Sequence, residues 1–186
     1  MKTRCRWVHD LPEDDLMVAY HDQEFGQPVH NNQKLFELLT LELFQSGLSW
    51  RTVLNKRANF QAAFADFDVD QVATFDDQDR DRLLADAGII RNRMKIDATI
   101  NNAKVIKALA ESGTSFADLV WELTDGETVT VGAGPAEKVP AQNQLSQDFS
   151  KKLKKAGFKF VGPVTMESFL EAVGVQNAHD LDCDFR

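Results

Sequence analysis

Cysteine is scarce in this sequence: Cys5 and Cys183 are the only two among its 186 residues. Two cysteines exclude the disulfide framework of a small secreted domain, and in a reducing cytosol they are more often metal ligands or inert thiols. The sequence also lacks any run of roughly 18 apolar residues, the length that a membrane-spanning helix needs. The N-terminal stretch MKTRCRWVHDLPEDD has no apolar core of a signal peptide. We therefore expect a soluble, cytoplasmic protein with no membrane partner.

Positive charge is also in short supply, because the formal net charge is −8. This deficit argues against a polyanionic partner, but the charge that a DNA-binding protein needs is local. The sequence has two local exceptions: KKLKKAGFK at 151–159, and the group Arg91, Arg93 and Lys95 in IIRNRMK. Either group, taken alone, is more typical of a solvated helix end. Net charge therefore leaves DNA binding open.

Alternating strand patterns are nearly absent, whereas the 3.6-residue period of helices dominates. The segment QKLFELLTLELFQ is apolar almost all round, which predicts a buried helix that ends by Gly47. The sequence contains no repeat and no linker, so we expect a single all-α domain over residues 1–186. The other predicted helices span 50–64, 77–88, 91–112, 115–123, 145–157 and 163–174, and the glycines and prolines of 125–144 predict a loop.

Each cysteine has a histidine that could share a metal with it. His179 and Cys183 are about one helical turn apart and can face the same point. Cys5 and His21 would complete a closed Cys2His2 set, which suits tetrahedral zinc and would pin both chain ends. The spacing alone is also compatible with chance. His9 and His30 have no cysteine partner, and we expect them at the surface.

The segment at about 146–172 predicts two helices joined by a short turn. Gly157 and Gly162 allow the backbone to approach a phosphate, and amides at the start of the second helix favour an anion. Lys154, Lys155 and Lys159 lie on either side of the turn and can neutralise neighbouring phosphates. This is the arrangement of a helix–hairpin–helix element that binds the DNA backbone. An ordinary hairpin of the core would explain the glycines but not the lysines.

A carboxylate stands where the helical period predicts burial. At about 100° per residue, Glu42 projects between Leu35 and Leu38 on an apolar helix face. A buried carboxylate must be paired, protonated or directed at a cavity that receives a polar ligand. Aromatic residues at Trp7, Tyr20, Phe25 and Trp50 favour the cavity, because an acid among aromatic rings suits a flat, electron-poor base. A paired structural carboxylate is the alternative.

With these features in place, the chain resembles the bacterial 3-methyladenine DNA glycosylase I family. The resemblance runs from about residue 4 to residue 183. The strings that carry it, in this order, are RCRWV, AYHDQEFG, KLFELLTLE, GLSWRTVLNKR, DAGIIRNRMKI, KKAGFKFVG and the final H-x3-C.

The resemblance implies a helical fold with a helix–hairpin–helix, a monomer, and one structural zinc ion held by Cys5, His21, His179 and Cys183. It places Glu42 on the carboxylate that hydrogen-bonds the excised base, Tyr20 on the pocket tyrosine, and Trp50 and Trp7 on the aromatic walls. Phe25 and Leu48 complete the predicted substrate-binding set. Two departures concern the pocket: Phe25 stands where family members have Trp, and Leu43 and Phe44 replace smaller or polar residues after Glu42.

The implied activity is that of a monofunctional glycosylase, which hydrolyses the N-glycosidic bond of 3-methyladenine in alkylated double-stranded DNA and releases the free base. The alternatives are a non-catalytic DNA-binding module that keeps the zinc and the hairpin, and a zinc-stabilised interaction domain. Asp180 and Asp182 lie where related superfamilies have a catalytic aspartate, but their place between two predicted zinc ligands argues for a structural role.

Overall fold

The computed structural model describes residues 2–134, 137 and 139–186, and these residues are mostly helical, as predicted. In this part of the chain, no helix is both long and apolar enough to cross a bilayer. The elements in chain order are α1 (Leu16–Gln23), α2 (Asn32–Gln45), α3 (Trp50–Leu54), α4 (Arg57–Ala63), η1 (Ala65–Phe67), α5 (Val69–Val72), α6 (Asp77–Ala85), α7 (Arg93–Glu111), α8 (Phe116–Trp121), η2 (Glu122–Thr124), β1 (Val129–Thr130), α9 (Gln144–Ala156), α10 (Pro163–Ala172) and β2 (Gln176–Asn177).

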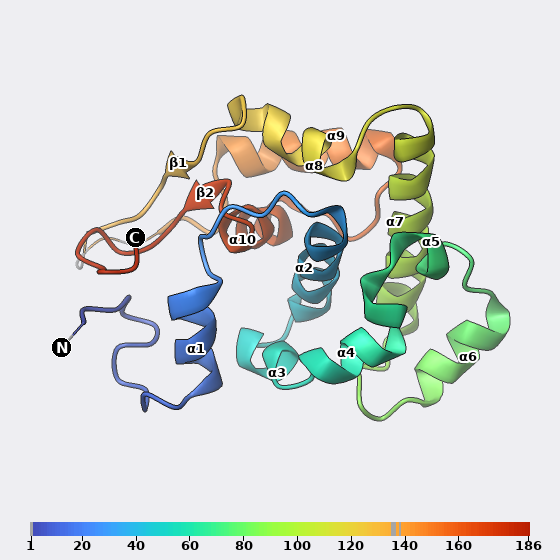
Figure 1. The fold of residues 1–186 in the computed structure, drawn as a ribbon, viewed down its shortest axis with the longest axis horizontal. Coiled ribbons are helices and arrows are strands. Elements are labelled where there is room, and N and C mark those ends of the chain that lie inside the picture. The colour runs from blue at the N-terminus through green and yellow to red at the C-terminus, as the bar shows by residue number, and fades with distance from the viewer. Residues whose placement is uncertain (1, 135–136, 138) are drawn as a thin grey trace.

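Helix α2 lies at the centre of the fold (Figure 1). Asn31 caps its start by accepting a hydrogen bond from the backbone N–H of Lys34. Every side chain from Leu35 to Phe44 is buried, because α10, α3, α7 and α8 pack around the helix. A helix surrounded in this way has no solvated face, which explains its apolar sequence. The prediction of a buried helix is confirmed.

The predicted helix 50–64 is wrong in one respect, because it is two helices. Helix α3 ends at Leu54, and α4 begins at Arg57 without a side-chain cap. Lys56, between them, points its Nζ at the carbonyl oxygens of Ala87 and Gly88, each 3.4 Å away. Arg57 forms ion pairs with Glu24, the residue that follows α1, and with Glu37 of α2. These partners are distant in sequence, so a local helical pattern cannot reveal the break.

The predicted loop 125–144 contains one element that the pattern did not predict. Its β1 pairs in parallel with β2, with Val129 opposite Gln176. The pairing brings the C-terminal segment beside this loop, on the side where Figure 1 also places both chain ends. The two ends are bonded directly: the N–H of Asp184 donates to the carbonyl of Thr3, at 3.0 Å. The chain ends therefore lie side by side, close to α1.

Helices α9 and α10 form the predicted pair with a short turn between them. Gly157 ends α9 with a φ of +100°, which glycine adopts without strain. Asn101 and Asn102 of α7 donate to the carbonyls of Gly157 and Lys159, at 2.9 and 3.1 Å. These bonds to the long helix α7 hold the turn in one conformation.

Candidate active site and metal centre

A cavity of about 190 Å³ opens between α1, α2, α3 and α10. A cavity of this volume can hold a flat group of the size of a nucleobase. The cavity contains most of the predicted base-binding residues and four others. Its lining residues are Trp7, Met17, Tyr20, Phe25, Glu42, Gln45, Trp50, Ser168 and Glu171.

Glu42 carries the strongest chemical signal in this cavity. The residue is only 5% exposed, and its Oε2 has no hydrogen-bond partner in the described part of the chain. Burial raises the pKa of this carboxyl to about 8, and the nearby Glu171 adds to the rise. An unpaired buried oxygen costs free energy unless a ligand satisfies it. The position predicted from the helical period is thus observed, and the carboxyl lacks a structural partner.

A second carboxylate on the same helix behaves in the opposite way. Glu37 is 6% exposed but accepts hydrogen bonds from Arg57 and Gln61, at 2.7 and 3.0 Å. Burial alone would raise its pKa, yet the bonds from Arg57 and Lys34 outweigh burial and hold the pKa below its usual value. Glu37 is therefore the structural carboxylate of α2, whereas Glu42 is free to bind a ligand.

Aromatic rings form the walls around Glu42. The rings of Tyr20 and Trp50 are 5.1 Å apart between centroids, and Trp7 and Phe25 meet edge to face at 5.3 Å. Tyr20 is buried, whereas Trp7 remains 37% exposed at the mouth. The Nε1 of Trp50 is buried and, within the described residues, has no acceptor. The cavity thus presents flat surfaces beside unsatisfied polar atoms, which a base with hydrogen-bonding edges could use.

The structure separates the remaining predicted pocket residues from the cavity wall. Leu48 lies in the turn after α2 and is 46% exposed, so its side chain faces solvent. Leu43 and Phe44 are fully buried in the hydrophobic core and do not line the cavity. Their substitution therefore affects packing behind the helix rather than the surface that a base would touch.

The expected solvated helix end formed by Arg91, Arg93 and Lys95 is wrong for Lys95: the two arginines are exposed, but Lys95 is buried. Its side chain is buried, and its Nζ donates to the carbonyls of Phe44 and Ser46, at 2.8 and 2.6 Å. The last carbonyls of a helix lack partners within the helix, and a cation there satisfies them. Lys95 therefore fixes the end of α2 and the turn that leads to Trp50.

The four predicted metal ligands are brought together from both ends of the chain. Cys5, His21, His179 and Cys183 are all buried, and their ligand atoms all lie within 4.8 Å of one another. Both cysteines are free thiols. Burial raises the pKa of Cys5 to about 12, and Cys183 beside it adds to the rise. Cysteine binds a metal ion as its thiolate, so metal binding at this cluster would release the thiol protons.

Polar neighbours orient the two histidines. The Nδ1 of His21 lies 2.8 Å from Asp22, and the Nδ1 of His179 lies 3.0 Å from Asn177, so both Nε2 atoms are turned toward the cysteines. The Nε2 of His179 is buried with no partner in the described part of the chain. Carboxylate and amide groups hold metal-bound histidines in this way. The donor set therefore fits a metal that sequence spacing alone could not establish.

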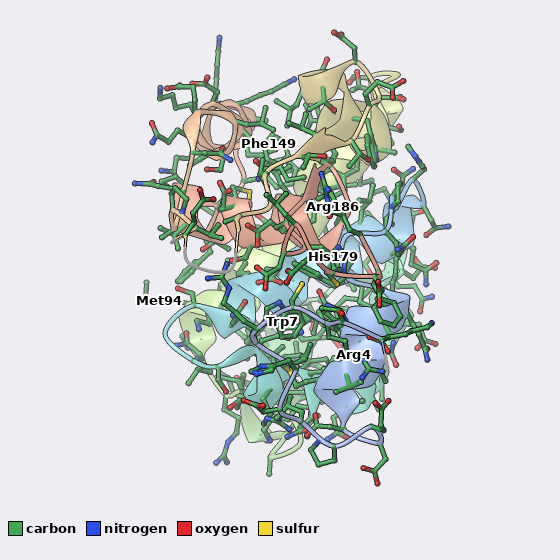
Figure 2. The ribbon with its side chains drawn as sticks, turned by 90° about the vertical axis from the view of Figure 1, so that its left-hand side faces the viewer. Arg4, Trp7, Met94, Phe149, His179 and Arg186 are labelled. Carbon is green, nitrogen blue, oxygen red and sulfur yellow. The ribbon has the colours of Figure 1, made fainter. Side chains whose placement is uncertain are left out.

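Gly26 makes room for this histidine. A Cβ at position 26 would lie 2.9 Å from a ring carbon of His179, and its φ of +72° is one that other residues rarely adopt. The next residue back, Phe25, packs its ring against His179 at 5.0 Å between centroids. The metal-binding cluster and the aromatic cavity thus share a wall, and Figure 2 shows His179 of the cluster and Trp7 of the cavity on the same side of the molecule.

The basic side chains of the hairpin are exposed. Lys154, Lys155 and Lys159 all face solvent, and none has an ion-pair partner among the residues described. Gly162 begins α10 without a side-chain cap, and Pro163 takes the first helical position. His9 and His30 are exposed, as predicted.

Comparisons with known proteins agree on one family. Residues 7–186 match the model of the methyladenine glycosylase family. The chain is 43% identical over 180 residues to DNA-3-methyladenine glycosylase 1 of Escherichia coli K12, covering 97% of this chain and 95% of that protein.

Solved structures give the same result for the fold. A crystal structure of 3-methyladenine DNA glycosylase I superposes with a TM-score of 0.92 at 44% identity, covering 98% of each chain. The Staphylococcus aureus enzyme, studied for its recognition of 3-methyladenine, superposes with a TM-score of 0.89 at 37% identity, covering 94% of this chain and 93% of that one. The chain therefore belongs to the methyladenine glycosylase family, that of the type I 3-methyladenine DNA glycosylases.

Proposed function

We propose that this chain is a monofunctional DNA glycosylase that removes 3-methyladenine from alkylated double-stranded DNA and so initiates base excision repair. Membership of the family supports this proposal. Within the structure, one observation carries it: the buried, unpaired Oε2 of Glu42 in a cavity with aromatic walls. A structural carboxylate would have partners like those of Glu37.

The chemistry of the substrate explains why such a cavity suffices. An adenine methylated at N3 in DNA is a cation, so the base leaves as a neutral molecule when the bond to C1′ breaks and takes the bonding electrons. The enzyme must mainly remove the nucleotide from the base stack and select it. In our proposal Glu42 accepts a hydrogen bond from the base, Tyr20 contacts its polar edge, and Trp50 stacks on its face. Trp7 and Phe25 narrow the entrance.

Water then attacks C1′ and leaves an abasic site. Among the residues that the structure describes, no lysine lines the cavity. None of them is therefore placed to form a covalent intermediate with the sugar, and we expect the strand to stay intact. Asp180, a candidate from related superfamilies, accepts a hydrogen bond from Arg6 at 2.9 Å and does not line the cavity. We assign it to holding the C-terminal segment against the N-terminal one.

The experiment that tests this function is the release of free 3-methyladenine from duplex DNA treated with a methylating agent. The expected result is release of the base with no strand cleavage until the abasic site is treated with alkali. A chain that binds this DNA but releases no base would be a DNA-binding module with an inactive cavity. A chain that neither binds nor releases would be an interaction domain.

We assign one structural zinc ion per chain to the cluster of Cys5, His21, His179 and Cys183. Tetrahedral zinc places its N and S ligand atoms about 3.3–3.8 Å apart. The four ligand atoms here lie within 4.8 Å of one another, so they would need to move only slightly closer to bind the ion. All four positions are filled by protein, so the ion would join the chain ends rather than activate water. The shared Phe25 then stands between this centre and the base cavity.

We assign DNA binding to the hairpin formed by α9, the turn and α10, acting as a helix–hairpin–helix in a monomeric enzyme. The exposed lysines on either side of the turn, and the uncapped start of α10, provide charge and backbone amides for phosphates. The bonds from Asn101 and Asn102 support the assignment, because they hold the turn in place before DNA arrives.

Replacing Lys154 and Lys155 together by Ala is expected to weaken DNA binding by about tenfold at low salt, independently of sequence. Two phosphate contacts would be lost, so the slope of log K against log salt should fall by nearly 2. Titrations of unmodified duplexes at several salt concentrations measure both quantities. The double variant Lys2→Ala, Lys107→Ala removes the same charge outside residues 146–172 and serves as the control. Equal effects of the two pairs would mean that the hairpin belongs only to the core.

A further inference from the structure

A second carboxylate lies beside Glu42 in the base cavity. Glu171, in the last turn of α10, lines this cavity together with Glu42, Tyr20 and Trp50. Its side chain is partly exposed and has no hydrogen-bond or ion-pair partner in the part of the chain that the structure describes. No packing reason accounts for an acid at this wall of an aromatic cavity.

In the part of the chain that the structure describes, most charged groups around Glu171 are acidic. Glu42 lies across the cavity on α2, and Glu167 lies one turn earlier on the helix of Glu171. Glu171 raises the pKa of Glu42, and Glu167 raises the pKa of Glu171. Tyr20 faces it from α1 as a neutral phenol whose pKa is raised by burial and by Glu42. On the outer side a shallow hollow contains Arg6, Glu137 and Asp180, and Arg6 forms an ion pair with Asp180.

Among the described residues that line the cavity, no cation accompanies Glu42 and Glu171, and two such acids suit a cationic ligand. Burial raises the pKa of Glu171 to about 7, and Glu167 contributes to that rise. A positive charge placed between Glu42 and Glu171 would favour the ionised form of both. A neutral base would bring no such gain, and it would leave two like charges in a confined cavity.

We propose that Glu171 is a specificity-determining residue of the base pocket, whose carboxylate favours a positively charged N-alkylated purine over a neutral one. This inference rests on the proposed glycosylase function. In DNA the methylated base is a cation, and after the bond breaks it is neutral. Glu171 therefore favours binding of the damaged nucleotide and does not add to retention of the product. Glu42 serves both, because it accepts a hydrogen bond from either form.

The test uses the variant Glu171→Gln at pH 9, where both carboxyl groups of the wild type are ionised. Single-turnover release from methylated duplex DNA reports on the cationic nucleotide, and equilibrium binding of free 3-methyladenine reports on the neutral base. We expect release to fall about tenfold, the effect of one nearby charge at a partly screened site. The affinity for the free base should change less than about twofold. Glu171→Asp, which keeps the charge, should stay within about threefold of wild type in both assays.

The pH dependence provides a second readout that a merely structural residue would not change. Below neutral pH, a plot of the logarithm of the wild-type release rate against pH should have a slope approaching 2, because two carboxyl groups must ionise. For Glu171→Gln, the slope of log rate against pH should be 1. The rate should also begin to fall about one pH unit lower than in the wild type, because Glu42 no longer faces a second negative charge. The wild-type slope can be measured even if the variant fails to fold. Glu111→Gln, an exposed acid at the end of α7, is the control for net charge.

The outcomes separate the two proposals. A wild type that releases no 3-methyladenine overturns the proposed function and this inference with it. An active wild type with a slope of 1, or a Glu171→Gln variant as fast as wild type at pH 9, overturns the inference alone. Equal losses in release and in affinity for the neutral base also overturn it, because charge would then not be the property that Glu171 contributes.

Discussion

Glu42→Gln is expected to lower single-turnover release of 3-methyladenine by about a hundredfold, equivalent to roughly 2.7 kcal/mol of activation free energy. The Gln side chain keeps the shape of Glu but loses the charge and replaces one acceptor oxygen with a donor amide. That donor would face the donor edge of the base. Affinity for the free base should fall as well, and both effects are measured by excision and by ligand-induced shifts in melting temperature.

The same variant should make the ligand-free protein more stable at high pH. The pKa of Glu42 is about 8 in the fold, above its ordinary value of 4.5. The folded state therefore binds the proton more tightly than the unfolded state does, so the free energy of unfolding falls as pH rises from about 4.5 through 8. Glu42 alone should cost the wild type on the order of 5 kcal/mol over this window. Glu42→Gln should remove this part of the loss and keep only the part that Glu171 causes, because the pKa of Glu171 is also raised, to about 7. Melting curves at pH 5, 7 and 9 measure the difference.

Glu37→Gln is the matched control, because Glu37 is a buried carboxylate of the same helix with its partners in place. It should lower the melting temperature at neutral pH by leaving Arg57 without part of its counter-charge, and it should keep excision. The pKa of Glu37 is lowered, so its contribution to stability is lost as pH falls, in the opposite direction to Glu42. If Glu42→Gln melts much lower than wild type but excises at full rate in the cold, Glu42 is a scaffold residue.

Loss of the metal centre is expected to have the largest effect on stability. Cys183→Ala should remove the zinc and lower the melting temperature by about 10–15 °C, the shift that roughly 4–5 kcal/mol produces in a domain of this size. The reason is that Cys183 and His179 would no longer be tied to Cys5 and His21, and the chain ends would separate. Elemental analysis of protein purified without added metal should show one zinc ion per chain in the wild type and none in the variant.

The neighbouring substitution Asp182→Ala is the control, because Asp182 is exposed and is not one of the four clustered residues. It should retain zinc and melt within about 2 °C of wild type, as surface substitutions usually do. If the wild type contains almost no zinc and Cys183→Ala is as stable as the wild type, the cluster is not a metal site but four side chains that pack together.

Local sequence was sufficient for the helical class and for the most informative residue. The apolar pattern of α2 predicts a helix without a solvated face, and the same period places Glu42 on a buried face. The four metal-ligand candidates are identified by type and by pairing within each chain end. These predictions depend only on the order of residues within one helix, or on residue types, cysteine and histidine, that have few roles in a protein interior.

Tertiary structure alone decided which segments meet. The break between α3 and α4 follows from partners of Lys56 and Arg57 that are distant in sequence. Nothing local shows that Lys95 closes the end of α2, or that Glu171 reaches the same cavity as Glu42. The distinction between Glu37 and Glu42 is the sharpest case. The two residues are the same type on one buried helix, and only the side chains packed opposite them make one a structural ion and the other a group without a partner.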